Sequence, residues 1–175
     1  MKILKIISEA AETYDYGCIM LMFDSPNLLK IQDAIDPNHI VKDLKTDFHC
    51  TLLYGIHDDE VGDDKIEEIL HNYTFSTCKI YNISCFENDE YDILKLDVEG
   101  ENLSNANTEF KTLPHTNEYT EFRPHITIAY LEKGMGDEYV NKFKKYVDSG
   151  YFLSPQYAIY SKPSGERKKM NIGID

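Results

Sequence analysis

Phe-His-Cys-Thr-Leu-Leu-Tyr, from Phe48 to Tyr54, is the stretch on which the fold depends, and Pro-His-Ile-Thr-Ile-Ala-Tyr, from Pro124 to Tyr130, repeats its pattern. Both segments are rich in β-branched and aliphatic residues, which predicts two β-strands. Side chains alternate between the faces of a strand, so a histidine and a threonine two positions apart share one face. The same alternation predicts that both tyrosines lie on the opposite face, with the apolar residues. Each strand would present a polar pair on one side and anchor itself in the core on the other.

The two segments are more informative together than either is alone. A single His-x-Thr is short enough to occur by chance. Here both copies lie in strand-like runs, both have an aliphatic residue after the threonine, and both have a tyrosine two residues further on. If the strands adjoin, the side chains of His49, Thr51, His125 and Thr127 can converge on one small anion. The simpler alternative is that these are two half-buried strands whose histidines and threonines only form local hydrogen bonds.

The composition favours one soluble globular domain that spans residues 1–175. Hydrophobic residues make up 42% of the 175 residues, which is enough for a sizeable core. The formal net charge is −13. Because phosphate affinity comes largely from Lys and Arg, such a chain is a poor nonspecific binder of long nucleic acid. An anionic ligand would need a local cationic pocket.

The cysteines and the N-terminus predict a cytoplasmic protein. Cys18, Cys50, Cys78 and Cys85 form no C-x-x-C motif and lie mostly in apolar runs, as is typical of reduced, buried thiols. Their spacing does not favour a zinc site. The apolar start at residues 1–7 is interrupted by a lysine and is too short for a signal peptide or a membrane span, so no membrane association is expected.

The other elements are predicted from hydrophobic periodicity and from breaking residues. Helices are expected at 2–12, 28–36, 65–72 (capped by Asp64), 103–113 and 137–147, and strands at 18–23, 75–86, 91–98 and 151–161. Strands and helices do not alternate regularly, which favours an α+β fold with a largely antiparallel sheet. The duplicated motif suggests two related halves.

With these motifs, the sequence resembles the 2H phosphoesterase superfamily, which has two His-x-Thr/Ser motifs facing each other across a two-lobed α+β fold. Within it, the chain is most similar to the phage anti-CBASS cyclic-oligonucleotide phosphodiesterases. The similarity rests on Tyr14–Cys18, His49–Gly55 and Arg123–Tyr130, and it extends from about Tyr14 to the end of the chain. It implies antiparallel sheets, flanking helices, a central cleft and two pseudo-symmetric lobes within a single domain.

Two histidines without a metal cluster suit acid–base cleavage of an RNA-type phosphodiester. One imidazole would take a proton from an attacking ribose 2′-hydroxyl, and the other, as imidazolium, would protonate the departing 5′ oxygen. Thr51 and Thr127 would donate hydrogen bonds to the non-bridging oxygens. The sequence leaves open which histidine is the base. The resemblance implies cyclic di- and trinucleotide substrates, a reaction without metal or cofactor, and linear 3′-phosphorylated products.

The resemblance also implies residues that hold the nucleotide. An aromatic residue before the first strand would stack on a base; Tyr16 matches by position and Tyr14 is the second choice. An acidic and an aromatic residue are expected near the C-terminus. Glu166 matches the acid, and Ile172 or Tyr160 stands near the aromatic position, because the chain has no Trp. A set of basic residues could add positive charge, although a solvated surface is the simpler interpretation for those in the tail: Arg123, Lys162, Arg167, Lys168 and Lys169.

Two other functions stay open at this point. A 2′,3′-cyclic phosphodiesterase acting on RNA ends would use the same histidines, although it would need a more basic face. A non-catalytic protein that sequesters cyclic nucleotides would not need two titrating groups. No obligate protein partner is evident.

Overall fold

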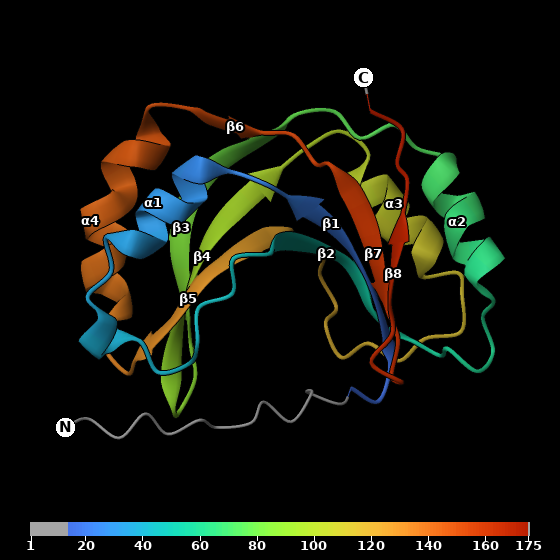
Figure 1. Ribbon diagram of the computed structural model, residues 1–175, viewed down its shortest axis with the longest axis horizontal. Helices are drawn as coiled ribbons and strands as arrows, with labels where there is room; N and C mark the ends of the chain where they lie inside the picture. The colour runs from blue at the N-terminus through green and yellow to red at the C-terminus, as the bar shows by residue number, and fades with distance from the viewer. Residues whose placement is uncertain (1–13, 175) are drawn as a thin grey trace.

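The computed structural model describes residues 14–174, so the helix predicted at 2–12 lies outside the described residues. One eight-stranded antiparallel sheet crosses this part of the chain in the order β6-β3-β4-β5-β2-β1-β7-β8 (Figure 1). The strands are β1 (Gly17–Phe23), β2 (Phe48–Ile56), β3 (Cys78–Glu87), β4 (Tyr91–Glu99), β5 (His125–Glu132), β6 (Tyr151–Leu153), β7 (Tyr157–Ser161) and β8 (Arg167–Met170). The helices are α1 (Pro26–Asp33), the 3₁₀ turn η1 (Pro37–His39), α2 (Asp63–His71), α3 (Leu103–Phe110) and α4 (Gly136–Asp148).

The predicted α+β fold with antiparallel strands and flanking helices is confirmed. The two His-x-Thr segments form β2 and β5, which are neighbours at the centre of the sheet. The strands make one continuous sheet rather than separate ones. β2 and β5 are joined by a single registered pair, Cys50 with Ile126, so the two halves of the sheet meet at the motifs.

The helices pack on the sheet face opposite to the histidines. Helix α4 contacts β3 and β4, α1 contacts β5, and α3 contacts β2. Figure 1 shows α1 and α4 at one end of the sheet and α2 and α3 at the other. The chain crosses between the halves, because α1 follows β1 but packs on β5, and α3 follows β4 but packs on β2. One apolar core runs beneath the whole sheet.

Helix α1 begins two residues earlier than predicted. Pro26 occupies the first turn, where the missing N–H of a proline leaves no helical hydrogen bond unmade. The hydroxyl of Ser25 caps the helix by accepting a hydrogen bond from the backbone N–H of Leu28.

The single strand predicted at 151–161 is in fact two strands, β6 and β7, which lie in opposite halves of the same sheet. β6 pairs with β3, whereas β7 pairs with β1. The chain leaves one half at Ser154-Pro155 and enters the other. The tail then adds β8, which the sequence analysis did not assign to an element; its hairpin with β7 turns at Gly165, whose φ is +91°.

An irregularity in each motif strand corrects the predicted side-chain directions. Along β2, Leu53 pairs with Ile19 but Thr51 pairs with Met20, so Leu52 is an extra residue. Tyr54 pairs with Cys18, two residues from Met20, and therefore shares the face of Thr51. The same shift occurs between Leu94 and Lys95 opposite β5, which brings Tyr130 to the face of Thr127. The prediction from simple alternation, that both tyrosines lie on the apolar face, is therefore wrong.

Two further observations concern the helices and the cysteines. No helix among residues 14–174 is long and apolar enough to cross a membrane. All four cysteines are free, with Cys50 and Cys78 buried and Cys18 and Cys85 partly buried.

Candidate active site

The antiparallel register brings the two motifs together. Since Cys50 pairs with Ile126, the flanking residues run in opposite directions, and His49 lies beside Thr127 while Thr51 lies beside His125. Opposed Cα atoms in such ladders are about 4.5–5.5 Å apart. The histidines are close enough that a charge on His125 disfavours a charge on His49.

Each histidine ring is held in the same way. Nδ1 of His49 lies 3.2 Å from the carbonyl oxygen of Asp47, and Nδ1 of His125 lies 2.9 Å from that of Arg123. A carbonyl oxygen can only accept, so Nδ1 donates in both rings. Nε2 is then the free nitrogen of each neutral ring, able to take a proton from a ligand and to return it.

Both histidines are poised to be neutral. Burial lowers the pKa of His49, against an opposing effect of the Asp47 carbonyl and carboxylate; the charges of Arg167 and His125 lower it further. Burial also lowers the pKa of His125, and Lys95 adds to this effect, whereas the Arg123 carbonyl and Asp97 oppose it. Because the two rings interact, their protons belong to the pair.

The threonines differ in their surroundings. The Thr51 hydroxyl lies within hydrogen-bond reach of the thiol of Cys18, whose pKa is raised to about 12 by burial. That thiol is therefore neutral and not a nucleophile. Thr127 lies opposite Lys95 of β4.

Lys95 and Asp97 form a buried ion pair beside His125. Lys95 is only 6% exposed, and its ammonium also donates to Ser84 Oγ at 2.7 Å. Asp97, which pairs with His125 across the ladder, accepts from Ser84 Oγ and from Asn82 Nδ2, each at 2.8 Å. The arrangement satisfies a buried charge that would otherwise be costly.

An aromatic ring links this ion pair to the histidine. Phe86 lies edge-to-face with His125, with ring centroids 5.5 Å apart, and the Lys95 ammonium is 4.5 Å from the Phe86 centroid. Phe86 thus covers the lysine and supports the imidazole from one side.

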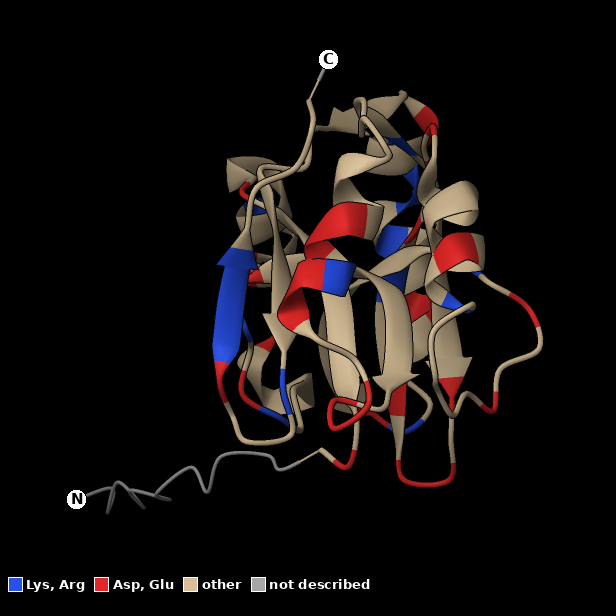
Figure 2. Cartoon of the chain, turned by 90° about the vertical axis from the view of Figure 1, so that its right-hand side faces the viewer, with Lys and Arg blue, Asp and Glu red and all other residues tan. Residues whose placement is uncertain are grey.

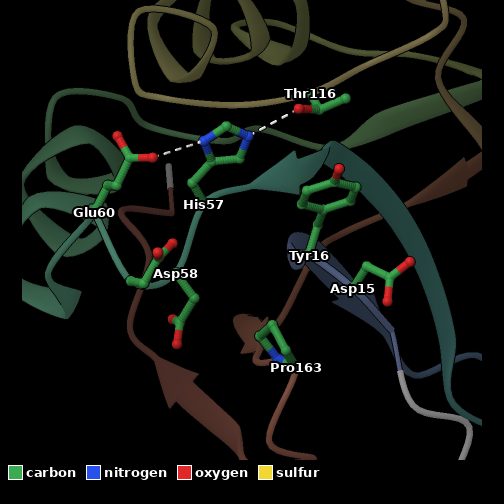
Figure 3. A pocket seen from close by; sticks show the side chains of 8 residues that line it. Asp15, Tyr16, His57, Asp58, Glu60, Thr116 and Pro163 are labelled. Carbon is green, nitrogen blue, oxygen red and sulfur yellow. Dashed lines mark hydrogen bonds and ion pairs between the residues drawn. The ribbon is translucent and has the colours of Figure 1, made fainter.

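Tyr16 lies at one end of the histidine face. Its ring stacks on His57 at 5.6 Å and contacts Tyr54 edge-on at 6.1 Å. It lines a hollow of about 570 Å³ (Figure 3), in which His57 bridges Glu60 and Thr116. The other lining groups include the carboxylates Asp15, Asp58 and Asp59. His49 and His125 are not among the residues that line this hollow.

The other predicted contact residues are placed differently. Tyr14 contacts Tyr54 edge-on beside Tyr16. Glu166 is exposed in the β7–β8 turn, where it pairs with Lys162 at 3.7 Å. Tyr160 is wholly buried and donates to Asp58 at 2.8 Å. With no surface available, Tyr160 does not fit the predicted contact with a nucleotide, and it acts as a core residue.

Lys95, Asp97, Ser84 and Phe86 are not among the site residues predicted from the sequence. A signal was present, because Lys95 and Asp97 lie among the apolar residues of segment 93–98 at positions two apart, which places both on one face. Within residues 14–174, no group of three or more His, Cys, Asp and Glu side chains is placed to hold a metal ion.

Comparisons with known proteins bear on the family and on the fold. The family model described as "Anti-CBASS protein Acb1" matches residues 15–152. Two solved structures with similar folds are those of Usb1 from Kluyveromyces marxianus, alone (TM-score 0.62, 10% identity) and with uridine monophosphate (TM-score 0.61, 9% identity). Each alignment covers 91% of this chain and 99% of the other. The chain therefore shares its fold, an α+β fold with an antiparallel sheet, with Usb1. No match was found among curated protein sequences.

Proposed function

The chain belongs to the anti-CBASS protein Acb1 family, and from that premise we propose that it is a phosphodiesterase that cleaves the 3′–5′ bonds of cyclic di- and trinucleotide immune signals. The observation that carries the proposal is the pair of imidazoles on one face of adjoining strands, each with Nδ1 held by a backbone carbonyl. Cleavage would silence the signal and let a phage evade CBASS defence.

The reaction is an internal displacement at phosphorus. The ribose 2′-oxygen forms a bond to phosphorus while the bond to the 5′ oxygen breaks. One neutral imidazole accepts the 2′-hydroxyl proton, and the other, as imidazolium, gives a proton to the leaving oxygen. The product carries a 2′,3′-cyclic phosphate, and water opens it to a 3′-phosphate with the histidine roles reversed.

Other side chains are candidates to hold the phosphate and the base of the nucleotide. Negative charge accumulates on the two non-bridging oxygens, and the hydroxyls of Thr51 and Thr127 are candidate donors to them. Tyr16 is a candidate stacking surface for a base, and Glu166 a candidate contact at the rim. A similar fold that holds uridine monophosphate supports a nucleotide as the ligand.

Incubation with 3′,3′-cyclic GMP–AMP in the presence of EDTA tests the proposal. We expect a linear, 3′-phosphorylated product by mass spectrometry. Binding without turnover would indicate a protein that sequesters the nucleotide, and turnover only of RNA with a 2′,3′-cyclic phosphate end would indicate an RNA-end enzyme. Either result would overturn the proposal.

Single substitutions test the two-histidine mechanism. We expect His49→Ala and His125→Ala each to lower kcat about 10²–10⁴-fold, the usual contribution of general acid–base catalysis. His71→Ala, at the exposed end of α2, is the matched control and should leave kcat unchanged. Near-normal rates in either motif variant, with the fold intact by circular dichroism, would contradict the mechanism.

A further inference from the structure

Strand β8 concentrates positive charge in an acidic molecule. It begins Arg167-Lys168-Lys169, and Figure 2 shows it as an almost entirely blue strand. Alternation along the strand separates these residues. Lys168 points to the helix face and bonds Asp63 of α2 at 3.1 Å. Arg167 and Lys169 therefore lie on the other face, which is the face of the paired histidines.

The sheet register connects Lys169 to the candidate active site. Lys169 pairs with Ile159, Ile159 with Met20, and Met20 with Thr51. The four residues form one row across β8, β7, β1 and β2. Three strand spacings correspond to about 14 Å between the outer Cα atoms, and the long lysine side chain on the same face shortens the separation.

An open hollow of about 550 Å³ lies beside His49. Met22, the cross-strand neighbour of His49, lines it together with Asp47, Tyr157 and Lys169. The Lys169 ammonium is 4.3 Å from the centroid of the Tyr157 ring. The ring limits the positions that the ammonium occupies at the wall of the hollow.

Arg167 brings a second cation to the same region. Its guanidinium bonds the Asp47 carboxylate at 3.0 Å, and the backbone carbonyl of Asp47 holds the His49 ring. The Arg167 charge is felt at His49 and at Cys18, which places it within electrostatic reach of the site. Because Arg167 is already paired with Asp47, Lys169 is the better candidate to bind an incoming anion.

We propose that Lys169, supported by Arg167, binds the second phosphate of a cyclic oligonucleotide while the first phosphate lies between the histidines. This inference rests on the proposed function. A cyclic substrate cannot present one phosphodiester to the imidazoles without bringing another close by. In a chain with a net charge of −13, that second anion needs a local cation.

Lys168 provides a matched control for Lys169. The two residues are adjacent and carry the same charge, but they face opposite sides of the sheet. For 3′,3′-cyclic GMP–AMP we expect Lys169→Gln to raise KM about tenfold, the size expected for one lost charge-assisted hydrogen bond, with kcat unchanged. Lys168→Gln should leave both constants unchanged.

A substrate with one phosphate separates a subsite from a general field effect. Linear ApA carries only the scissile phosphodiester, so Lys169→Gln and Lys168→Gln should both cleave it as the unsubstituted protein does. The inference is overturned if Lys169→Gln matches Lys168→Gln on the cyclic substrate, or if it loses as much on ApA.

A binding measurement keeps this inference distinct from the proposed activity. Calorimetry with a phosphorothioate analogue of cyclic GMP–AMP requires no turnover. In one outcome the protein binds the analogue, Lys169→Gln weakens that binding, and cyclic GMP–AMP itself is not cleaved. The subsite is then supported and the catalytic proposal fails. If cleavage occurs and Lys169→Gln binds the analogue normally, the subsite alone fails.

Discussion

At the scale of single residues, the local environment of each imidazole decides how it can act. Both rings donate Nδ1–H to a carbonyl two residues earlier in the chain, and both have a pKa lowered chiefly by burial. The charged groups around them differ. His49 faces Asp47 and Arg167, whereas His125 faces the Lys95–Asp97 pair.

The first prediction concerns the pH dependence of kcat. General acid–base catalysis by two histidines gives a bell-shaped dependence of kcat on pH. Lowering the pKa of the base moves the rising limb to lower pH, and lowering the pKa of the acid moves the falling limb to lower pH. We expect the optimum below the ordinary histidine pKa of 6.5. A pH–rate profile from pH 4 to 9, about 2.5 units to either side of that value, measures it. An optimum above pH 7 would contradict the lowered values.

The second prediction concerns the ion pair beside His125. The Lys95 charge lowers the pKa of His125 and the Asp97 charge raises it. Lys95→Met should therefore raise that pKa, and Asp97→Asn should lower it. An NMR titration of the labelled His125 ring measures both.

Loss of packing alone would not move the His125 pKa in opposite directions. Shifts of the same sign in the two variants would exclude the electrostatic explanation. Removing one partner of a buried pair costs about 3–5 kcal/mol, so the double variant Lys95→Met/Asp97→Asn, with no net charge left, serves as the reference if one single variant unfolds.

At the scale of elements, short irregularities and caps aim the functional side chains. The extra residue in β2 and its counterpart in β5 turn Tyr54 and Tyr130 toward the histidine face at opposite ends of the site. Tyr54 meets Tyr16 there, and Tyr130 meets Tyr91 at 5.6 Å. A hydrophobicity pattern cannot reveal these shifts, because the tyrosine side chain is amphipathic and can lie on the buried or the exposed face of a strand.

The third prediction concerns the start of α4. Asp92 of β4 is 1% exposed and accepts from the backbone N–H groups of Gly134 and Gly136, each at 2.9 Å. Burial by itself raises the pKa of Asp92, but the bonds from Gly136, Lys133 and Gly134 outweigh it and lower the value. We expect Asp92→Asn to lower the free energy of unfolding by about 2–3 kcal/mol at pH 7.

The sign of the pH effect follows from the lowered pKa. The stabilisation is present above the unfolded-state pKa near 3.8 and is lost as the pH falls through the lower folded-state value. The difference between the unsubstituted protein and Asp92→Asn should therefore shrink below that pH in urea unfolding. Asp89→Asn in the exposed β3–β4 turn is the control and should change stability little at any pH.

At the scale of the whole molecule, the sheet places the site at its centre. β2 and β5 occupy the two middle positions, and helices α1, α3 and α4 pack on the far face. Acidic residues dominate the loops around the sheet, whereas β8 carries consecutive cations (Figure 2). A small anion can meet these cations, but a long polyanion must also approach the acidic surface.

The fourth prediction is that long nucleic acid does not bind. With a net charge of −13, we expect the dissociation constant of a fluorescent single-stranded RNA 30-mer to be weaker than about 10⁻⁴ M at physiological salt. Fluorescence anisotropy measures it. Micromolar binding would favour the RNA-end function over the cyclic-nucleotide function.

Much of this arrangement follows from local patterns. The motif strands, the β3–β4 hairpin and helices α2 and α4 follow from periodicity and from breaking residues, because burial of one face imposes that pattern. The predicted Asp64 cap of α2 is wrong, because the helix begins at Asp63 and its N-cap residue is Gly62. The division of 151–161 between β6 and β7 does not follow, since it depends on which strands were left to pair. Strand β8 was not predicted either, because Arg-Lys-Lys has no strand preference of its own. This segment forms a strand by pairing with the edge of β7.

The sequence by itself determined that His49, Thr51, His125 and Thr127 lie in pairs on strand faces, because a pleated backbone repeats every two residues. Only the tertiary structure decided that the two strands adjoin, that Lys95 and Phe86 sit against His125, that Tyr160 is sealed in the core, and that Lys169 faces the site while Lys168 does not. These facts depend on contacts between segments far apart in the chain. Such contacts are set by the packing of one shared core, which no short stretch of sequence contains.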